Sequence, residues 1–277
     1  MKTKRRIKLA IVYVIVILLS ASFLLPLLWM VRSSFMELTQ IFELPPRIIP
    51  EPFQFQNYAD AMSFAPFGRY FINTFTIVIL NIIGVLLTSS LAAFSFSRIK
   101  WKGRDIIFGI LLTAMMLPGA VMIIPTFLGW QALGFYNTYA PLIVPAFFGG
   151  GAFNIFLLRQ FFMTIPQELD EAARVDGASY LKIYLHIILP LSRSALIVVG
   201  LFSFLASWND FFGPLIYLND ENLYTLALGL QHFQGSYNAE WSLLMAASAV
   251  VILPCIIVFM VCQKYFIKGI TLTGLKG

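Results

Sequence analysis

Residues that could carry out chemistry are few in this sequence, and no group of them forms a catalytic constellation. Only 12% of the 277 residues are charged, and the two histidines, His186 and His232, lack a cluster of further metal ligands. No G-x-S-x-G or G-x-x-x-x-G-K-[ST] motif is present, so neither a serine hydrolase nor a phosphate-binding loop is indicated. Asp210 stands alone in an apolar run, whereas an aspartyl protease needs two buried aspartates. The sequence therefore predicts that this chain is not an enzyme and holds no metal.

The polar residues around Asp210 suit the binding of a sugar. Trp208 offers an aromatic face, and Asn209 and Asp210 offer hydrogen-bonding groups. A charge in an apolar span usually faces a cavity or a partner, but Asp210 could equally end a helix or make a structural hydrogen bond. Asn73 and Asn81 roughly share a helix face, where they could line a polar path or bond neighbouring helices. The candidate substrate-path residues are Trp208, Asn209, Asp210 and Asn73.

The elements that must position these residues are long apolar segments. A chain that is 59% hydrophobic is neither disordered nor a nucleic-acid-binding tail. About 20 apolar residues cross a bilayer, so the charge-poor runs predict six transmembrane helices, at about 9–31, 70–97, 106–130, 138–158, 194–213 and 241–263. Kinks are expected in the third and fourth of these at Pro118, Pro125, Pro141 and Pro145. The glycines at 149–151 could allow close packing or local unwinding of the fourth. We expect an all-α membrane protein in which residues 1–277 form a single transmembrane domain.

The basic residues predict the orientation of these helices, because cytoplasmic loops carry an excess of Lys and Arg. Six crossings leave only Arg32, Arg47 and Arg69 on the outer side. The other sixteen of the nineteen basic residues fall on one side: Lys2, Lys4, Arg5, Arg6, Lys8, Arg98, Lys100, Lys102, Arg104, Arg159, Arg174, Lys182, Arg193, Lys264, Lys268 and Lys276. Both termini are therefore expected in the cytoplasm. The first apolar run exceeds a signal-peptide core of roughly 7–15 residues, which favours a retained helix.

The cytoplasmic loop at 159–193 carries strong helix signals. Thr164 to Gln167 has the pattern of a capping box with proline in the first turn. Asp170 and Glu171 lie four and three residues before Arg174, so both could pair with it. Gly177 can end this first helix in a left-handed conformation.

A second short helix is expected directly after the first. Ser179 can cap it, and Pro190 is expected to interrupt it. Ala172 and Ala173 give the first helix a small-residue face that another protein could approach closely. The segment could be simple loop structure or a docking element, and its order in so apolar a chain favours docking.

Several segments of the sequence resemble the carbohydrate-uptake permeases of the maltose-permease type among the ATP-binding-cassette (ABC) importers. Residues Glu171, Ala172, Ala173, Gly177, Ile187, Leu189 and Pro190 match every consensus position of the EAA loop of these permeases. Further similar stretches are PFGRYFINTF at 66–75, LLRQFFMTIP at 157–166, SWNDFFGPLIYL at 207–218, LYTLALGL at 223–230 and the final Lys-Gly. The resemblance spans nearly the whole chain. It departs in the tail LTGLKG, where the family has alanine and valine before Lys-Gly.

The resemblance implies the type I ABC importer permease fold in a cell (inner or plasma) membrane. It implies a complex with a second permease subunit of different sequence, two ATPase subunits and an extracellular or periplasmic sugar-binding protein. ATP and Mg²⁺ would be bound by the ATPase subunits, so this chain would need no cofactor. The EAA segment would be a coupling helix seated on an ATPase subunit, with coupling residues Glu171, Ala172, Ala173, Asp176, Gly177, Leu189 and Pro190.

The function implied is import of a sugar into the cytoplasm by alternating access, and an oligosaccharide is the favoured substrate. One alternative is the same machinery acting on glycerol phosphate or another solute, although the spans lack basic residues for an anion. A second alternative, of a different class, is an ATP-independent channel or carrier. The sequence contains neither paired N-P-A motifs nor an internal repeat to favour it.

Overall fold

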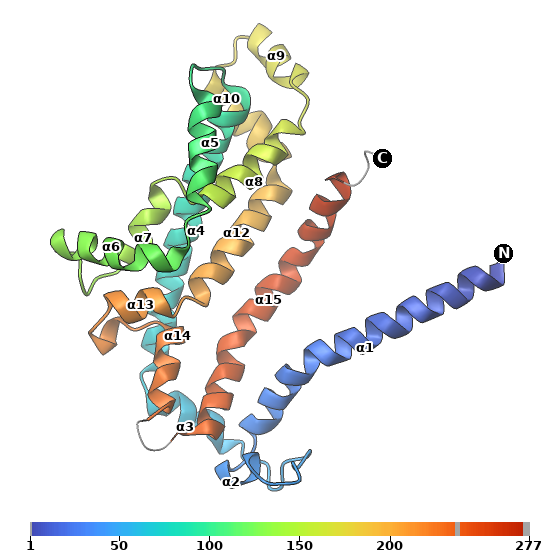
Figure 1. Cartoon of the computed structure of the whole chain (residues 1–277), viewed down its shortest axis with the longest axis vertical. Coiled ribbons are helices and arrows are strands. Elements are labelled where there is room, and N and C mark those ends of the chain that lie inside the picture. The colour runs from blue at the N-terminus through green and yellow to red at the C-terminus, as the bar shows by residue number, and fades with distance from the viewer. Residues whose placement is uncertain (1, 236–238, 274–277) are drawn as a thin grey trace. The chain divides into compact units, whose positions relative to one another are not determined.

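The computed structural model describes residues 2–235 and 239–273, and the part of the chain that it describes is built from helices (Figure 1). Part of the atypical tail, residues 274–277, lies outside the described residues and includes Lys276. The three longest helices are α1 (Lys2–Ser34), α4 (Phe67–Arg98) and α15 (Trp241–Thr273). The others are α2 (Leu38–Ile41), α3 (Gln56–Phe64), α5 (Arg104–Ala114), α6 (Gly119–Ala132), α7 (Ala140–Ile143), η1 (Val144–Phe147), α8 (Ala152–Met163), α9 (Glu168–Val175), α10 (Tyr180–Ile183), η2 (Tyr184–Ile188), α11 (Leu189–Leu191), α12 (Arg193–Trp208), α13 (Phe212–Tyr217), η3 (Glu221–Leu223), α14 (Leu226–Gly229) and η4 (Leu230–Phe233).

Four helices are long and apolar enough to cross a membrane: Arg6–Ser34, Phe67–Arg98, Ala140–Met163 and Trp241–Tyr265. Two further candidates are bent pairs of helices, α5 with α6 and α10–α11 with α12. The count within the described residues is therefore four, or six if each bent pair is one span. The predicted third and fifth helices correspond to the two bent pairs.

The chain divides into two compact units. The first consists of Met1–Gly68 and Gly229–Leu253, and the second of Arg69–Leu228 and Pro254–Gly277. In the first unit, the segment after α1 is held by Asn57, whose side-chain amide donates to the carbonyls of Ser34 and Met36 at 2.9 Å. Phe35 packs there against Tyr58, with ring centroids 5.1 Å apart. The proline-rich connection after α1 is therefore folded back onto the end of that helix.

The second unit is built around α4, α8, the helices of the 180–191 segment and α12. Its core contains the fully buried side chains of Leu158, Phe162, Ile188 and Val199 together with Phe94 of α4. Apolar faces of four segments meet here, and burial of each large aliphatic or aromatic side chain contributes roughly 1.5–3 kcal/mol. This core fixes the C-terminal ends of α4 and α8, called their inner ends below, and thereby holds the 159–193 loop in place.

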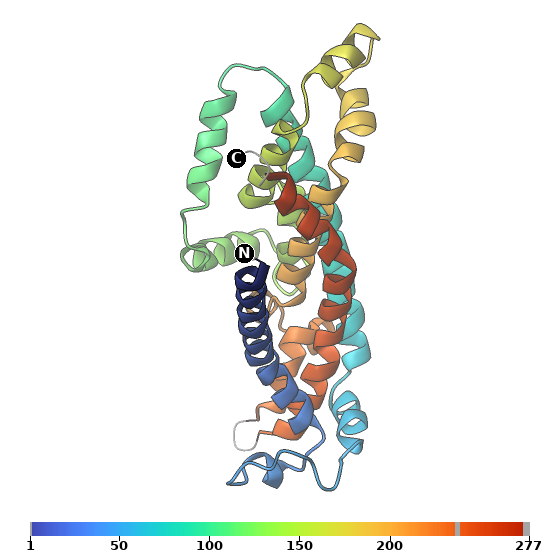
Figure 2. The ribbon, with the colours of Figure 1, turned by 90° about the vertical axis from the view of Figure 1, so that its right-hand side faces the viewer.

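The third predicted span is sharply bent at Pro118, which confirms the kink expected there. The axes of α5 and α6 differ by 98°, and Figure 2 shows the two helices running in different directions. Pro118 has an extended conformation and directly precedes the first residue of α6. Proline disfavours a helical conformation in the residue before it, so the helix of α5 does not continue through this position. Pro125 lies inside α6 without ending it.

The fourth span is interrupted by a triplet of glycines. Gly149, Gly150 and Gly151 have φ values of +103°, +63° and +89°, a region that glycine adopts without steric cost. A Cβ atom on Gly150 would lie 2.8 Å from the carbonyl oxygen of Val85 and 2.9 Å from Oγ1 of Thr88. Both alternatives considered for these glycines therefore occur together, because the chain unwinds here and also packs tightly against α4.

We predict that Gly150→Ala destabilises the protein, because the new methyl group meets the α4 backbone in a conformation that costs about 1–3 kcal/mol for residues other than glycine. Thermal unfolding in detergent should show a lower midpoint than for the wild type. Gly129→Ala is the matched control, since no atom lies within 4 Å of a Cβ at Gly129. Equal midpoints for the two variants would contradict this account of the helix break.

Candidate functional site

The first helix of the 159–193 loop is α9, and its start differs from the predicted capping box. Its N-terminal capping residue is Gln167, and no side chain accepts a capping hydrogen bond there. Thr164 instead belongs to the end of α8, where its hydroxyl donates to the carbonyl of Phe161 at 2.7 Å. The capping box is absent because α8 continues to Met163, which leaves Thr164 on the preceding helix.

The end of α9 confirms the predicted role of Gly177. This residue has a φ of +77°, its N–H donates to the carbonyl of Arg174 at 3.0 Å, and the N–H of Ala178 donates to the carbonyl of Ala173 at 2.9 Å. These two bonds form a Schellman motif, which satisfies carbonyls left without partners at a helix end. The turn after α9 is therefore fixed by its own backbone.

The second helix of the loop begins as predicted and ends later than predicted. Ser179 caps α10, where its Oγ accepts from the N–H of Lys182 at 3.3 Å. The chain then stays helical through a wider π-helical turn, Tyr184–Ile188, and through Pro190 to Leu191. The expected interruption at Pro190 is thus displaced to Ser192, where the axis bends by 79°. A π-turn before Pro190 changes the hydrogen-bond register, so the missing proline N–H does not end the helix.

The predicted pairing of Arg174 with its neighbouring acids is wrong. The guanidinium of Arg174 lies over the ring of Tyr180, 5.1 Å from its centroid. Asp170 forms an ion pair with Arg98 of α4, with Nη1 and Oδ2 3.1 Å apart. A long-range partner has replaced the local one, because α9 packs beside the inner end of α4.

Arg98 is a buried residue of this site that no sequence pattern singled out. Its side chain is 3% exposed, and its Nη2 donates to the carbonyls of Phe162 at 2.5 Å and Ile165 at 2.7 Å. Burial raises the pKa of the Asp170 carboxyl, and the nearby positive charge of Arg98 only partly opposes this effect. The only sequence signal was a basic residue at the end of an apolar helix, which positive-inside statistics explain equally well.

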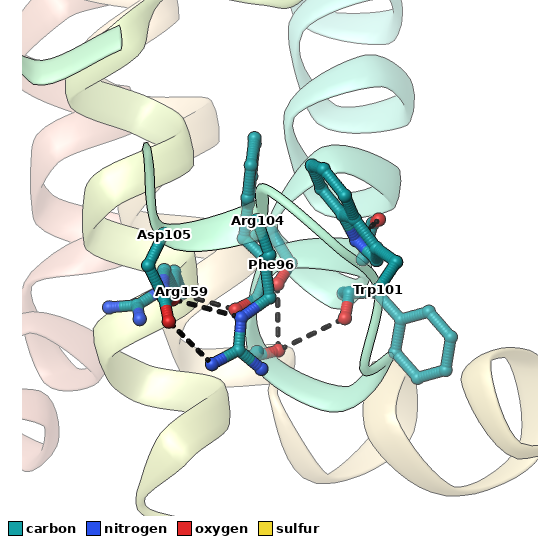
Figure 3. A network of polar contacts seen from close by, with 9 residues as sticks. Phe96, Trp101, Arg104, Asp105 and Arg159 are labelled. Atoms are coloured by element: carbon teal, nitrogen blue, oxygen red, sulfur yellow. Dashed lines mark hydrogen bonds and ion pairs between the residues drawn. The ribbon is translucent and has the colours of Figure 1, made fainter. Parts of the chain in front are cut away.

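A second arginine, Arg159, also joins α8 to α4. Arg159 of α8 donates from Nε to the carbonyl of Phe96 at 3.2 Å (Figure 3). Its guanidinium lies over the ring of Phe108, 4.2 Å from the ring centroid. Figure 3 also shows the ion pair of Arg104 with Asp105, in which Nε and Oδ1 are 2.9 Å apart and the Asp105 side chain is exposed. The inner ends of α4 and α8 are therefore braced by two arginines, Arg98 and Arg159.

The two alanines of α9 face different environments, contrary to the expectation of one shared small-residue face. Ala173 packs against the core of the second unit, whereas Ala172 is exposed. Leu169 and Val175 are exposed on α9 as well, and Val175 is 88% exposed. One side of α9 is thus attached to its own chain, and the other presents small and apolar side chains outward.

A polar cleft of about 270 Å³ is lined by residues of α4, α9 and α10. Five of its nine lining side chains are ionisable in the Arg, Lys, Asp and Glu classes: Arg98, Lys100, Asp170, Glu171 and Arg174. Glu171 therefore lies at the edge of the cleft, on a helix whose opposite face is open. Among the described residues, no group of three or more His, Cys, Asp or Glu side chains could hold a metal ion.

The three predicted substrate-path residues at the end of α12 have distinct environments. Trp208 is 1% exposed and packs against Phe204, with ring centroids 5.3 Å apart. The Oδ1 of Asp210 accepts from the N–H of Gly213 at 3.0 Å, which is the structural hydrogen bond considered as its alternative role. Asn209 is exposed, and its amide donates to the carbonyl of Leu205 at 2.8 Å. The aromatic face of Trp208 is used for packing in this structure.

Asn73 fastens the loop that follows α13, which lies on the outer side in the predicted topology and is called the outer loop below. Its amide donates to the carbonyl of Asn222 at 2.8 Å and to that of Tyr224 at 2.9 Å. The neighbouring Thr74 accepts from the N–H of Leu226 at 2.8 Å. The amide of Asn73 therefore holds a loop, which is a different role from those of Trp208 and Asp210.

A pocket of about 280 Å³ lies between α4, α8 and α12, beside the helix break at 149–151. Its polar lining residues are Asn81, Asn154, Ser203 and Ser207, and its apolar ones are Val85, Phe153, Phe202 and Ala206. Asn81 donates to the carbonyl of Leu142 at 2.9 Å, so it both bonds a neighbouring segment and lines a polar space. The buried hydroxyl of Ser203 has no hydrogen-bond partner within residues 2–235 and 239–273. The sequence pointed to this pocket only through Asn81 and the glycine triplet.

Comparison with known proteins gives one consistent result. Residues 84–272 match the family described as "binding-protein-dependent transport system inner membrane component". The chain is 34% identical over 252 residues to the probable ABC transporter permease protein YurM of Bacillus subtilis, covering 91% of this chain and 83% of that protein. It is 34% identical over 264 residues to the trehalose/maltose transport system permease protein MalG of Thermococcus litoralis, covering 94% of each.

The fold is also similar to a solved structure. One chain in the crystal structure of a bacterial ABC transporter involved in the import of the acidic polysaccharide alginate superposes with a TM-score of 0.82. The alignment covers 94% of this chain and 97% of that chain at 24% sequence identity. This likeness confirms the predicted all-helical membrane fold.

We predict that Asn73→Ala loosens the outer loop at 219–226, because two carbonyls lose their donor at a cost of about 1–3 kcal/mol. Hydrogen exchange and limited proteolysis of this loop should both become faster. The matched control is Thr76→Ala, since the exposed Thr76 hydroxyl donates only to Ile72 of its own helix. Unchanged protection of the loop in Asn73→Ala would contradict the fastening role.

Proposed function

Because this chain belongs to the family of binding-protein-dependent transport system inner membrane components, we propose that it moves an oligosaccharide into the cytoplasm by alternating access. It is a multi-pass permease subunit of an ABC importer for sugars, as its resemblance to the carbohydrate-uptake permeases predicted. The observation that carries the proposal is α9, a short helix held to its own chain on one side and open on the other.

The coupling site of this proposal is the segment from α9 to α11. The exposed Ala172 and Val175 offer a close-packing surface for an ATPase subunit, with Glu171 and Asp176 as polar contacts beside it. Ala173 anchors the helix to the core, and Gly177 fixes the turn. Leu189 and Pro190 lie at the bend into α12 and complete the set. A rigid helix–turn–helix can transmit a push on α9 to the transmembrane helices.

The complex of this proposal contains two permeases, two ATPase subunits and a sugar-binding protein outside the membrane. The second permease is a different chain, and ATP and Mg²⁺ are bound by the ATPase subunits. The binding protein delivers sugar to the outer end of the spans. The loop held by Asn73 lies on that side in the predicted topology, which makes it a contact surface for the binding protein.

The sugar path of this proposal runs past the pocket between α4, α8 and α12. Its volume is near the lower end of the roughly 300–1,000 Å³ typical of ligand pockets. Hydroxyl and amide groups beside the Phe153 and Phe202 rings suit a sugar, and no lining residue is basic, which favours a neutral substrate over a phosphate ester. Asn209 and Asp210 continue the sugar path after α12. Trp208 supports the end of α12 by packing against Phe204, and Asn73 holds the outer loop in place.

The proposed function is tested by reconstituting the complex in vesicles with its binding protein and a panel of mono- and oligosaccharides. We expect ATP hydrolysis to rise only with the binding protein and its cognate sugar, and sugar to accumulate inside. Stimulation by glycerol phosphate alone would change the substrate class. Uptake without any ATPase subunit would overturn the proposal in favour of a channel or carrier.

We predict that Gly177→Ala lowers sugar uptake while leaving membrane insertion intact. The left-handed conformation costs an alanine about 1–2 kcal/mol, enough to shift the population of this turn about 5- to 30-fold. Uptake and the amount of inserted protein should be measured together. Gly103→Ala imposes the same strain, with a φ of +86° and equally open surroundings, outside the coupling segment. A similar loss of uptake in both variants would argue against a specific role for Gly177.

We predict that Ser207→Leu lowers the rate of sugar transport about tenfold, which corresponds to roughly 1.4 kcal/mol, because the larger side chain occupies the pocket. Stimulation of ATP hydrolysis by the binding protein should persist. Val198→Leu adds bulk to the same helix outside the pocket and serves as the control. Wild-type transport by Ser207→Leu would remove this pocket from the sugar path.

A further inference from the structure

The last residue of α4 lies where three segments of the chain meet. The side chain of Arg98 is 3% exposed, and a buried guanidinium is retained only where partners replace the lost water. Its partners come from different segments: Phe162 at the end of α8, Ile165 in the connection that follows, and Asp170 in the first turn of α9. A single side chain thus joins α4 to both helices that flank this connection.

Helix dipoles explain why a cation occupies this position. The carbonyl of Phe162 is at the C-terminal end of α8, where the dipole favours positive charge, and it accepts from Arg98 in addition to the N–H of Ile165. Asp170 is in the first turn of α9, where the dipole favours negative charge. Arg98 therefore binds both the C-terminal end of α8 and the first turn of α9.

The remaining attachments of α9 are few. Ala173 packs against the core, and Arg174 contacts Tyr180 of the following helix. Leu169, Ala172 and Val175 are exposed. Among the residues that the structure describes, Asp170 is the one polar contact through which a force on the open face of α9 can reach α4.

The Arg98–Asp170 pair is poorly suited to stabilising the fold. Buried ion pairs often cost as much in lost hydration as they gain in attraction, and burial raises the pKa of Asp170 despite the nearby arginine. A pair of this kind is better explained by the geometry that it imposes. The fork of a guanidinium can hold two carbonyls and a carboxylate in fixed directions, which a lysine cannot do.

We propose that Arg98 is a positioning residue that joins the coupling segment to α4 and α8, so that movement of α9 displaces both helices together. The proposal rests on the proposed function of α9 as the contact with an ATPase subunit. It adds the specific link by which this chain would convert that contact into movement of two transmembrane helices.

The test uses Asp170→Asn in the complete transporter, purified with its own subunits and reconstituted with its binding protein. The readout is the number of ATP molecules hydrolysed for each sugar imported. We expect this ratio to rise about 2- to 30-fold, the range seen when residues of a coupled network are changed. Stimulated ATP hydrolysis and the amount of assembled complex should stay near wild type.

Asp105→Asn is the matched control, because it makes the same chemical change in an acid that is 72% exposed and pairs with its sequence neighbour Arg104. Its ratio should equal that of the wild type. Arg98→Lys keeps the charge and removes the fork, so an increase in the ratio is expected there as well. Asp170→Glu keeps the pair and should restore the ratio toward wild type.

A wild-type ratio in both Asp170→Asn and Arg98→Lys would overturn the proposal. Failure of both variants to assemble would also overturn it, because Arg98 would then serve folding and not coupling. These outcomes differ from failure of the proposed function, in which the wild-type complex itself would show no ATP hydrolysis stimulated by the binding protein.

Discussion

The need to satisfy backbone carbonyls inside an apolar chain governs this structure. A membrane offers no water to groups that a broken helix leaves without partners, so side chains must bond them. Asn81 donates to Leu142, Thr88 to Ala146, and Asn154 to Gly150, all in the interrupted fourth span. At the C-terminal end of α8, Arg98 adds a second donor to the Phe162 carbonyl, which also accepts from the N–H of Ile165. Polar side chains of this chain therefore supply donors to the carbonyls at the break in its fourth span.

The polar pocket of the second unit and the bend that leads into α12 both lie at breaks in its helices. Three successive glycines with positive φ open the fourth span, and the polar pocket lined by Asn154 and Ser203 lies beside them. The bend at Ser192 sets the direction of α12 relative to the helices before it. Discontinuous helices are where transporters commonly hold their substrates, because unwound backbone and polar side chains meet there at membrane depth. The same constraint thus accounts for the pocket and for the shape of the coupling segment.

The coupling segment and the pocket are connected through the same helices. Both α4 and α8 contribute residues to the pocket, and both are braced at their inner ends by Arg98 and Arg159. A displacement imposed at α9 would therefore reach helices that line the proposed sugar path. Close packing, such as that of Gly150 against α4, makes such helices move as bodies instead of deforming continuously.

The sequence by itself determined the features that depend on neighbours a few residues apart. The helical class, the break at Pro118, the Schellman motif at Gly177 and the cap at Ser179 were all predictable, because each rests on local backbone conformation. The EAA pattern was enough to identify the family. Local signals failed where two features competed, as at Thr164, which ended α8 instead of beginning α9.

Tertiary structure alone decided which distant groups meet. Asp170 could have paired with Arg174 on its own helix, but packing brought Arg98 of α4 within 3.1 Å. Trp208 had the composition of a sugar contact and became buried among phenylalanines, while Asn73 became the fastener of a distant loop. Such outcomes depend on how helices pack over long sequence separations, and the free-energy differences between alternative partners are not encoded in any short pattern. The sequence therefore identified the kind of protein, and the fold selected the residues that hold its moving parts together.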